Sequence, residues 1–419
     1  MKLAHIAANL NRRQCTHLHD LDLIKSLMNS NDEYIAKRTK LRQEEKAIFD
    51  KNTFKFGQRP SEEQLLKLKD FKSRSSVVEK QYKTNYAKLN ELIMALPNDI
   101  SEHTLDKEKI LYEDDISELP LAIQHEEYGT INNLIDFKTA AKVSGNSFYY
   151  LKNKAVFLQQ GLINYALKFY NNKGFDVMTT PDIVNSTINT ACGFQPRQTS
   201  KNEYHLSNNK VLCATAEIPL AGYHSETTTT FKGKDEPLFK DHILVKELGY
   251  PCMHVGLGKA YRAETGSYNA MSRGLYRVHE FSKVELFIVC LPLHSNELFE
   301  YLLSCQKEFF KSLGLYIKVI EMPASDLGSS AYRKVDIEAY FRGRQTFGEL
   351  SSTSHCTTFQ SKRLNICYRR DGKLKLFHTL NGTGCAVQRT MACGLEQWQK
   401  NGKVILPKVL QDEVGFESL

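Results

Sequence analysis

The sequence predicts an α+β protein in two parts, a helical N-terminal hairpin and a larger domain built on a mainly antiparallel sheet. Residues 18–96 are rich in lysine, glutamate and leucine and follow a helical period. From residue 131 onwards, apolar strand-like runs alternate with two helical stretches, near 149–171 and 294–313. Helices that interrupt runs of strands are typical of a sheet with helices packed on it.

The hairpin is predicted from heptad spacing in two segments. In the second segment the spacing is the 3-4-3-4 pattern of a coiled-coil seam, at Leu68, Phe71, Ser75, Val78, Tyr82, Asn85, Leu89, Leu92 and Leu96. In the first segment a seam residue recurs every seven positions, at Leu27, Tyr34, Leu41 and Ile48. A capping box at Ser61 predicts a helix start there, after a turn near residues 51–60. Taken alone, this pattern favours a coiled coil that dimerises the protein.

Three other segments complete the predicted organisation. The first 19 residues hold no acidic residue, a bias of mitochondrial presequences. This bias makes residues 1–17 a candidate presequence remnant, and an ordinary N-terminal helix or strand is the alternative. Residues 97–130, with two prolines and an acidic run, are expected to be a linker, and residues 401–419 an irregular tail packed on the surface of the domain at 131–400.

The chain is basic, and its cysteines form no pattern. A net charge of +8 favours an acidic partner such as nucleic acid. The longest apolar run is about half of the roughly 18 residues that a membrane-spanning helix needs, so no membrane partner is expected. Ten cysteines are scattered without CxxC or paired Cys/His spacing, which argues against a disulfide scaffold and against a zinc cluster. We expect reduced thiols and no zinc.

The segment from Tyr261 to Glu285 carries the strongest chemical signal. Two extended stretches flank a loop rich in glycine, serine and asparagine. Because alternate residues of a strand share a face, Arg262 and Glu264 are predicted to point one way, and the returning strand aligns its own polar residues, Arg277, His279, Phe281, Lys283 and Glu285. Two guanidinium groups suit the oxygens of a triphosphate, and an aromatic ring suits a purine. The alternative is an amphipathic hairpin with solvated charges.

This segment resembles motif 2 of the class II aminoacyl-tRNA synthetases and is most similar to that of seryl-tRNA synthetases of the animal mitochondrial type. Other landmarks follow the same order. They are a motif 1-like helix, strand and proline at Leu162–Val184, a Thr-Ala-Glu signature at Thr215–Glu217, a segment at Phe347–Ile366 that resembles the metal and phosphate site, and a motif 3-like segment at His378–Thr390.

The resemblance implies a class II catalytic domain with an antiparallel sheet, preceded by an arm that binds tRNA. It implies ATP, L-serine and tRNA(Ser) as partners, Mg²⁺ bound with ATP, a homodimer, and work in the mitochondrial matrix. The implied activity forms seryl-adenylate and then transfers the seryl group to the 3′ end of tRNA. A catalytically silent paralogue that binds tRNA is the alternative.

The resemblance also implies roles for individual residues. Serine would be held by Thr215, Glu217, Arg262, Glu285 and Thr383. ATP would be held by Arg262, Glu264, Arg277, Phe281, Glu349, Ser351, Ser352 and Arg389. Glu349 and Ser352 would bind the metal, and Arg262, Arg277 and Arg389 would be catalytic by stabilising charge.

Several local expectations complete this interpretation. Thr215 and Glu217 are predicted to share a face of one strand, and residues 381–384 to form a tight turn into a helix. His355 is expected to be an ordinary polar loop residue. Gln388 stands where many relatives have glycine, and the sequence does not explain this difference.

Overall fold

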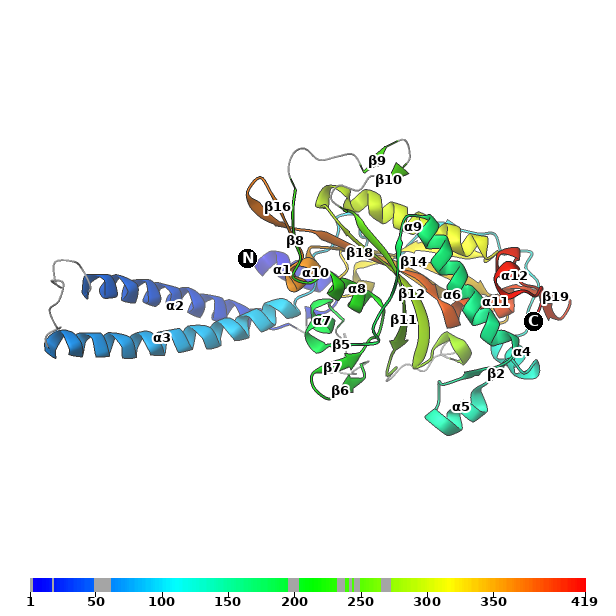
Figure 1. Cartoon of the computed structure of the whole chain (residues 1–419), viewed down its shortest axis with the longest axis horizontal. Coiled ribbons are helices and arrows are strands. Elements are labelled where there is room, and N and C mark those ends of the chain that lie inside the picture. The colour runs from blue at the N-terminus through cyan, green and yellow to red at the C-terminus, as the bar shows by residue number, and fades with distance from the viewer. Residues whose placement is uncertain are drawn as a thin grey trace. The chain divides into compact units, whose positions relative to one another are not determined.

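The computed structural model describes residues 3–16, 19–48, 62–194, 203–231, 238–240, 243–244, 249–264 and 273–419. The predicted turn at 51–60, the capping box at Ser61 and the loop at 265–272 lie outside this description. The chain divides into two compact units, Met1–Leu96 and Pro97–Leu419 (Figure 1). No helix in the described part of the chain is long and apolar enough to cross a bilayer.

The described residues of the first unit form three α-helices. They are α1 (Leu3–Arg12), α2 (Leu21–Ile48) and α3 (Glu62–Ala95). Helices α2 and α3 run antiparallel along each other (Figure 1), as two ion pairs show, Arg38 with Glu79 (2.9 Å) and Arg74 with Glu44 (3.1 Å). At 1.5 Å per residue, α3 is about 50 Å long.

The residues of the predicted α3 seam are the ones that the partner helix shields. Phe71 and Leu89 are buried, whereas Leu66 and Val77, on the other faces of α3, are exposed. The seam also includes a polar contact, since Asn85 Nδ2 donates to the Leu27 carbonyl (2.9 Å). The apolar spacing therefore decides which face of each helix is covered.

The segment interpreted as a presequence remnant contains the helix α1. Its Leu10 is fully buried in a cluster with Ile24, Leu89 and Leu96. An amphipathic pattern serves equally for a packed helix and for a targeting segment, so the helix alone does not test the presequence interpretation.

The second unit is built on an eight-stranded sheet in the order β1-β13-β14-β15-β18-β12-β11-β4. The strands are β1 (Lys109–Glu113), β13 (Ile317–Glu321), β14 (Arg333–Phe341), β15 (Thr346–Thr357), β18 (His378–Ala386), β12 (Glu280–Cys290), β11 (Cys252–Tyr261) and β4 (Asp176–Thr179). Only the β11–β4 pair is parallel within this sheet. The predicted α+β class with an antiparallel sheet is confirmed.

Two long helices cover one face of this sheet, α6 (Lys154–Asn172) and α9 (Ser295–Ser312) (Figure 1). They correspond to the two predicted helical stretches. Val284, Leu286 and Ile288 of β12 point into the core beneath them. Phe287 and Val289, with the opposite parity, belong to a second cluster with the short helix α8 (Glu217–Tyr223). One face of β12 therefore packs against the core under the long helices, and the other face packs against α8.

The smaller elements surround this framework. They are α4 (His125–Ile131), β2 (Ile135–Asp136), α5 (Phe137–Ser144), β3 (Tyr150–Leu151), β5 (Ile183–Asn185), α7 (Ser186–Ala191), β6 (His205–Leu206), β7 (Lys210–Leu212), β8 (Thr228–Thr230), β9 (Phe239–Lys240), β10 (Ile243–Leu244), η3 (Gly274–Tyr276), η4 (Pro292–His294), η5 (Ala324–Asp326), α10 (Phe359–Leu364), β16 (Cys367–Arg370), β17 (Lys373–Leu376), α11 (Val387–Gln397), β19 (Gln399–Lys400), β20 (Lys403–Val404) and α12 (Lys408–Val414).

The buried amide of Gln306 on α9 joins the central strands from the helix side. Its Nε2 donates to Ser351 Oγ (2.9 Å) and to the carbonyls of Ser352 (3.1 Å) and Thr383 (3.0 Å). Thr353 Oγ1 donates to its Oε1 (2.5 Å). One side chain thereby holds β15 and β18 at a fixed separation.

A β-bulge in β15 changes which residues face the helices. In the β14–β15 pair, Glu338 lies opposite Glu349 and Ile337 lies opposite Ser351, which leaves Leu350 as the extra residue. Leu350 is buried in the core, and Ser351 also points toward the helices, because it contacts Gln306. Glu349 and Ser352 are consequently left on the other face of the sheet.

Three expectations about local structure are wrong. The linker at 97–130 includes β1, an edge strand of the main sheet, whose backbone pairs with β13 from Lys109 to Glu113. The tail at 401–419 includes α12, whose Leu410 is fully buried. Residues 381–384 continue strand β18 rather than turning. Their glycines permit close packing, since a Cβ at Gly382 would lie 2.7 Å from the Gln306 amide.

Candidate active site

The candidate site lies on the sheet face that α6 and α9 do not cover. At its centre is Glu285 of β12, which pairs with Thr383 of β18 on one side and Gly256 of β11 on the other. Lys283, two residues earlier, has the same parity. Its Nζ lies 2.7 Å from Glu285 Oε2 and 3.1 Å from Thr215 Oγ1. Burial raises the pKa of Glu285, and Lys283 opposes this shift.

Thr215 and Glu217 reach this face from a turn and a helix, so the prediction of a shared strand face is wrong. Thr215 lies in a bend, and Glu217 is the first residue of α8. The Glu217 backbone N–H donates to Thr215 Oγ1 (3.3 Å). Pro219 fits the first turn of a helix, where its missing N–H is not needed. The sequence interpretation relied on the strand-like alternation of Thr215, Ala216 and Glu217. It gave too little weight to this proline, which favours the start of a helix.

Glu217 is held by two amides that the sequence analysis did not assign. Its Oε1 accepts from Gln360 Nε2 (2.6 Å) and Asn381 Nδ2 (2.9 Å). Gln360 is fully buried, and its own Oε1 accepts from Thr379 Oγ1 (2.6 Å). Burial, followed by repulsion from Glu285, raises the pKa of Glu217 to about 7. Asn381 was visible within the motif 3-like segment, but nothing in the sequence distinguishes Gln360.

Three arginines gather beside this acidic pocket, as predicted for motif 2 and motif 3. Arg262 follows β11, donates from Nε to the Ala214 carbonyl (3.3 Å), and lies over the Phe281 ring (5.3 Å to the centroid). Burial lowers the pKa of Arg262, and the nearby Arg389 acts in the same direction.

Arg277 and Arg389 are each fixed by an acid. Arg277 hydrogen-bonds Glu264 through Nε. Arg389 on α11 donates from Nη1 to the Glu349 carbonyl (3.1 Å) and from Nε to the Tyr276 carbonyl (3.0 Å). The three arginines, Glu264 and Phe281 line one cavity, together with Leu275, Tyr276, Val278 and Gln388.

Oxygen ligands suitable for Mg²⁺ lie at the β14–β15 pair. Although burial alone would raise the pKa of Glu349, Arg389, Lys334 and Arg262 lower it to about 2, so this carboxylate is ionised. Ser352 lies on the same face. Asp336, opposite Ser352, adds a second carboxylate, whose Oδ1 is buried and has no hydrogen-bond partner among the described residues. Hard oxygen donors of this kind fit Mg²⁺.

Two expectations for this strand are wrong. Ser351 is placed away from the arginines, because the bulge turns it toward α9, where it donates to the Thr383 carbonyl (2.6 Å). His355 is a buried strand residue rather than a loop residue. Its Nδ1 accepts from the Thr357 N–H (3.1 Å), and burial, with His378 nearby, lowers its pKa to about 3.

Gln388 is explained by its contacts. Its Oε1 accepts from the Ser282 N–H (2.8 Å) and its Nε2 donates to Gln159 Oε1 (2.7 Å). The side chain thus links α11 to β12 and to α6. A glycine at this position would lack both hydrogen bonds.

Comparisons with known proteins point to one family. The family described as tRNA synthetase class II core domain (G, H, P, S and T) matches residues 236–398. The serine–tRNA ligase of Treponema denticola is 42% identical over 300 residues, which are 70% of this chain and 67% of that protein. That of Dictyoglomus thermophilum is 40% identical over 298 residues, 70% of this chain and 66% of that protein. The aligned part thus spans about two thirds of the length of these curated relatives.

Solved structures agree with this comparison. The seryl-tRNA synthetase from Pyrococcus horikoshii complexed with ATP has a TM-score of 0.85 and 27% identity, covering 100% of this chain and 97% of that one. The cytoplasmic serine-tRNA ligase from Naegleria fowleri in complex with AMP has a TM-score of 0.82 at 23% identity, covering 100% of this chain and 95% of that one. At that identity, the second match shows the fold alone.

Glu217 should make the free energy of unfolding depend on pH. Its pKa in the folded chain, about 7, lies above the ordinary value of 4.5, so the folded state keeps a proton that the unfolded chain loses. This stabilising difference is complete below the unfolded pKa and is lost as pH rises through 7. We predict that Glu217→Gln raises the free energy of unfolding at about pH 8, relative to the wild type, by about 2 kcal/mol more than at about pH 5.

Urea unfolding of both proteins at the two pH values measures this difference. Glu118→Gln, at an exposed position, is the matched control and should leave the pH dependence unchanged. The same pH slope in wild type and Glu217→Gln would show that Glu217 is ionised throughout this range.

Proposed function

This chain belongs to the serine–tRNA ligase family of class II aminoacyl-tRNA synthetases, and we propose that it activates L-serine with ATP and transfers the seryl group to the 3′ end of tRNA(Ser). The observation that carries the proposal is the junction of two pockets. An acidic pocket with two threonine hydroxyls adjoins a cavity lined by three arginines, and Arg262 stands between them.

The charge of the acidic pocket suits an amino acid. Lys283 neutralises Glu285, so ionised Glu217 leaves one net negative charge for the single ammonium group of serine. Thr215 and Thr383 are buried and supply hydroxyls beside the carboxylates. A pocket that pairs the serine hydroxyl rejects alanine by roughly 10⁴-fold, because its own polar groups would otherwise stay unpaired. The Thr383 methyl group helps to exclude a larger side chain by contact.

The side chains that line the arginine-rich cavity have the chemistry that ATP requires. Phe281 offers a ring face for the purine, and Arg277 and Arg389 meet phosphate oxygens. Glu349 and Ser352, with Asp336 beside them, would hold Mg²⁺, which when bound adds positive charge near the phosphates. Ser351, buried beneath α9, is not part of this set.

The chemistry needs no covalent bond to the protein. A carboxylate oxygen of serine attacks the α-phosphorus of ATP, and pyrophosphate leaves. A terminal ribose hydroxyl of tRNA then attacks the seryl carbonyl carbon, loses its proton, and AMP leaves. Arg262 contacts the Ala214 carbonyl and the Phe281 ring. These contacts orient its guanidinium group before the reaction. Positioning and preorganised charge of this kind are the main sources of catalysis in such transfers.

The first unit suits a tRNA-binding arm. Seven basic side chains on α3 are exposed, Lys67, Lys69, Lys72, Arg74, Lys80, Lys83 and Lys88. Phosphate contacts supply much of the affinity of proteins for nucleic acids. The α2–α3 pair, packed along its heptad seam, supports the long α3 helix and presents these cations. The coiled coil thereby serves recognition rather than dimerisation.

Assembly and compartment are part of the same proposal. The motif 1-like segment, α6 followed by β4 and Pro181, favours a homodimer, which light scattering would contradict by finding a stable, active monomer.

The acid-free first 19 residues and the likeness of the motifs to the animal mitochondrial type favour the mitochondrial matrix. A fluorescent fusion of the full-length precursor that stays in the cytosol would contradict this assignment.

The catalytically silent alternative has no support in this geometry. A chain that had lost catalysis is expected to lose the arginines and carboxylates of the site first. Here Thr215, Glu217, Glu285 and Thr383 converge, and the arginines line one cavity. Serine-dependent exchange of pyrophosphate into ATP tests the activity directly. Absence of exchange by the folded protein with Mg²⁺ would refute it.

We predict that Arg262→Ala lowers the rate of serine-dependent pyrophosphate exchange by roughly 10² to 10³-fold, because one charge-assisted donor to the reacting phosphate is lost. Arg369→Ala, at an exposed position on β16, is the matched control and should retain activity. Circular dichroism establishes that both variants fold. An Arg262→Ala variant with near wild-type exchange would remove this residue from the reaction.

We predict that deletion of residues 1–96 preserves pyrophosphate exchange and abolishes tRNA aminoacylation, since the residues for serine and ATP all lie in the second unit. A milder variant replaces Lys69, Lys80 and Lys83 with glutamine. In it, tRNA affinity should fall and depend less steeply on salt concentration. Equal loss of both activities would mean that the arm stabilises the catalytic unit, and unchanged aminoacylation would place the tRNA elsewhere.

A further inference from the structure

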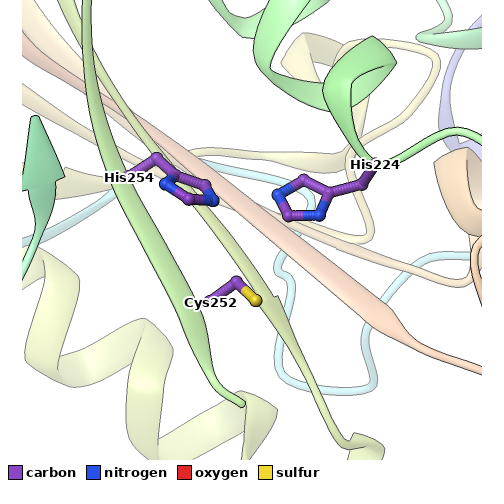
Figure 2. Close-up of side chains that lie close together, drawn as sticks. All are labelled: His224, Cys252 and His254. Carbon is purple, nitrogen blue, oxygen red and sulfur yellow. The ribbon is translucent and has the colours of Figure 1, made fainter. Parts of the chain in front are cut away.

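A cluster of two histidines and one cysteine lies outside the candidate active site. His224 directly follows α8, and Cys252 and His254 are the first and third residues of β11. The three donor atoms all lie within 4.8 Å of one another. Figure 2 shows the two imidazole rings facing each other from opposite elements, with the cysteine side chain beside them.

The two histidines of the cluster are largely closed to solvent, whereas Cys252 is partly exposed. His224 is 5% exposed and His254 is 8% exposed. Their ring centroids are 5.0 Å apart, and His224 also stacks on Phe287 at 6.3 Å. The Nε2 atom of His224 is buried and has no hydrogen-bond partner among the described residues. Because buried polar atoms are nearly always paired, such an atom requires an explanation, and an ion is one of the recognised ones.

We propose that His224, Cys252 and His254 bind a borderline-soft transition-metal ion of the zinc class. Imidazole nitrogen and thiolate sulfur are the ligands that Zn²⁺ prefers, whereas Mg²⁺ and Ca²⁺ prefer oxygen. In a tetrahedral zinc site, bond lengths of about 2.0–2.3 Å put neighbouring ligand atoms roughly 3.3–3.7 Å apart. The present donor atoms lie within 4.8 Å of one another, and binding an ion would draw them together to that spacing. Three protein ligands leave a fourth position for water.

The proposed site would replace the expectation of no zinc. The sequence alone does not reveal it, for a physical reason. Cys252 and His254 are separated by one residue on a strand, so their side chains share a face. His224 comes from a distant part of the sequence and is delivered by the end of α8. Linear Cys/His spacing therefore gives no indication of the cluster.

The bound ion would be structural. Helix α8 begins at Glu217 and its opposite end is followed by His224, while β11 begins at Cys252 and ends next to Arg262. The ion would link the C-terminal end of α8 to the N-terminal end of β11. These are the ends that lie away from Glu217 and Arg262. The expected effect of the ion is that Glu217 and Arg262 keep a constant distance and orientation relative to each other.

A second cluster, His125 with Glu126 and Glu396, shows the contrast. His125 Nδ1 lies 2.8 Å from Glu396 Oε1, and its Nε2 accepts from the Leu275 N–H at 3.2 Å. Both ring nitrogens of His125 are already used by the protein. That cluster therefore serves to hold η3 against α11 and has no nitrogen left for a metal.

The test is a titration of the full-length protein, freed of metal by a chelator, with Co²⁺ as a spectroscopic substitute for Zn²⁺. We expect one equivalent per chain, a sulfur-to-cobalt charge-transfer band, and displacement of Co²⁺ by one equivalent of Zn²⁺. Cys252→Ser should abolish the charge-transfer band and weaken binding at least about 100-fold, which exceeds the usual loss for a residue outside the coordination shell. Cys15→Ser, a cysteine outside the cluster, should leave both unchanged.

The outcomes are decisive without any measurement of activity. His224→Asn should weaken binding like Cys252→Ser. A wild-type protein that binds no Co²⁺ or Zn²⁺ at micromolar concentration refutes the proposal, whatever the variants do. Binding that persists in Cys252→Ser and His224→Asn is adventitious and refutes it equally. Since pyrophosphate exchange is not used, failure here is distinguishable from failure of the proposed function.

Discussion

The register of strand β12 between β11 and β18 is the constraint on which the rest of the site depends. Pairing places Glu285 between Gly256 and Thr383, and parity sends Lys283 and Glu285 to one face and Val284 and Leu286 to the other. A slip of one residue would exchange the two faces completely. The apolar core under α6 and α9 therefore fixes which face of β12 carries Lys283 and Glu285. In a slipped register these charged residues would be buried in the core without partners.

Three cations of the site are each paired with an acid before any substrate arrives. Lys283 contacts Glu285, Arg277 contacts Glu264, and Arg389 contacts Glu349. An unpaired charge in a partly dry cavity costs several kcal/mol, so these acids keep the cations in place in the absence of phosphate. Glu217 differs, since it is held by two neutral amides and repelled by Glu285. Burial, followed by repulsion from Glu285, raises its pKa, and Lys283 offsets this shift only in part.

Sequence analysis predicted the features that depend on local pattern. Heptad spacing predicted the α2–α3 seam, strand alternation predicted the polar face of β12, and linked motifs predicted the arginines. It failed where tertiary context decides. The edge strand β1 and helix α12 are too short to have a clear period. Ser351 was misplaced because a bulge does not change composition. Gln360 and Gln306 were missed because a buried amide is recognised only by the groups that surround it.

The bulge at Leu350 has a consequence for how this protein tolerates change over evolutionary time. It lets Glu349 and Ser352, an odd number of positions apart, share one face of β15. A replacement at a neighbouring residue alters one contact. Removal of a single residue from the bulge would instead restore a regular pleat and turn the following part of the strand over. This short stretch can therefore drift by substitution, while its length is held constant by the geometry of the strand.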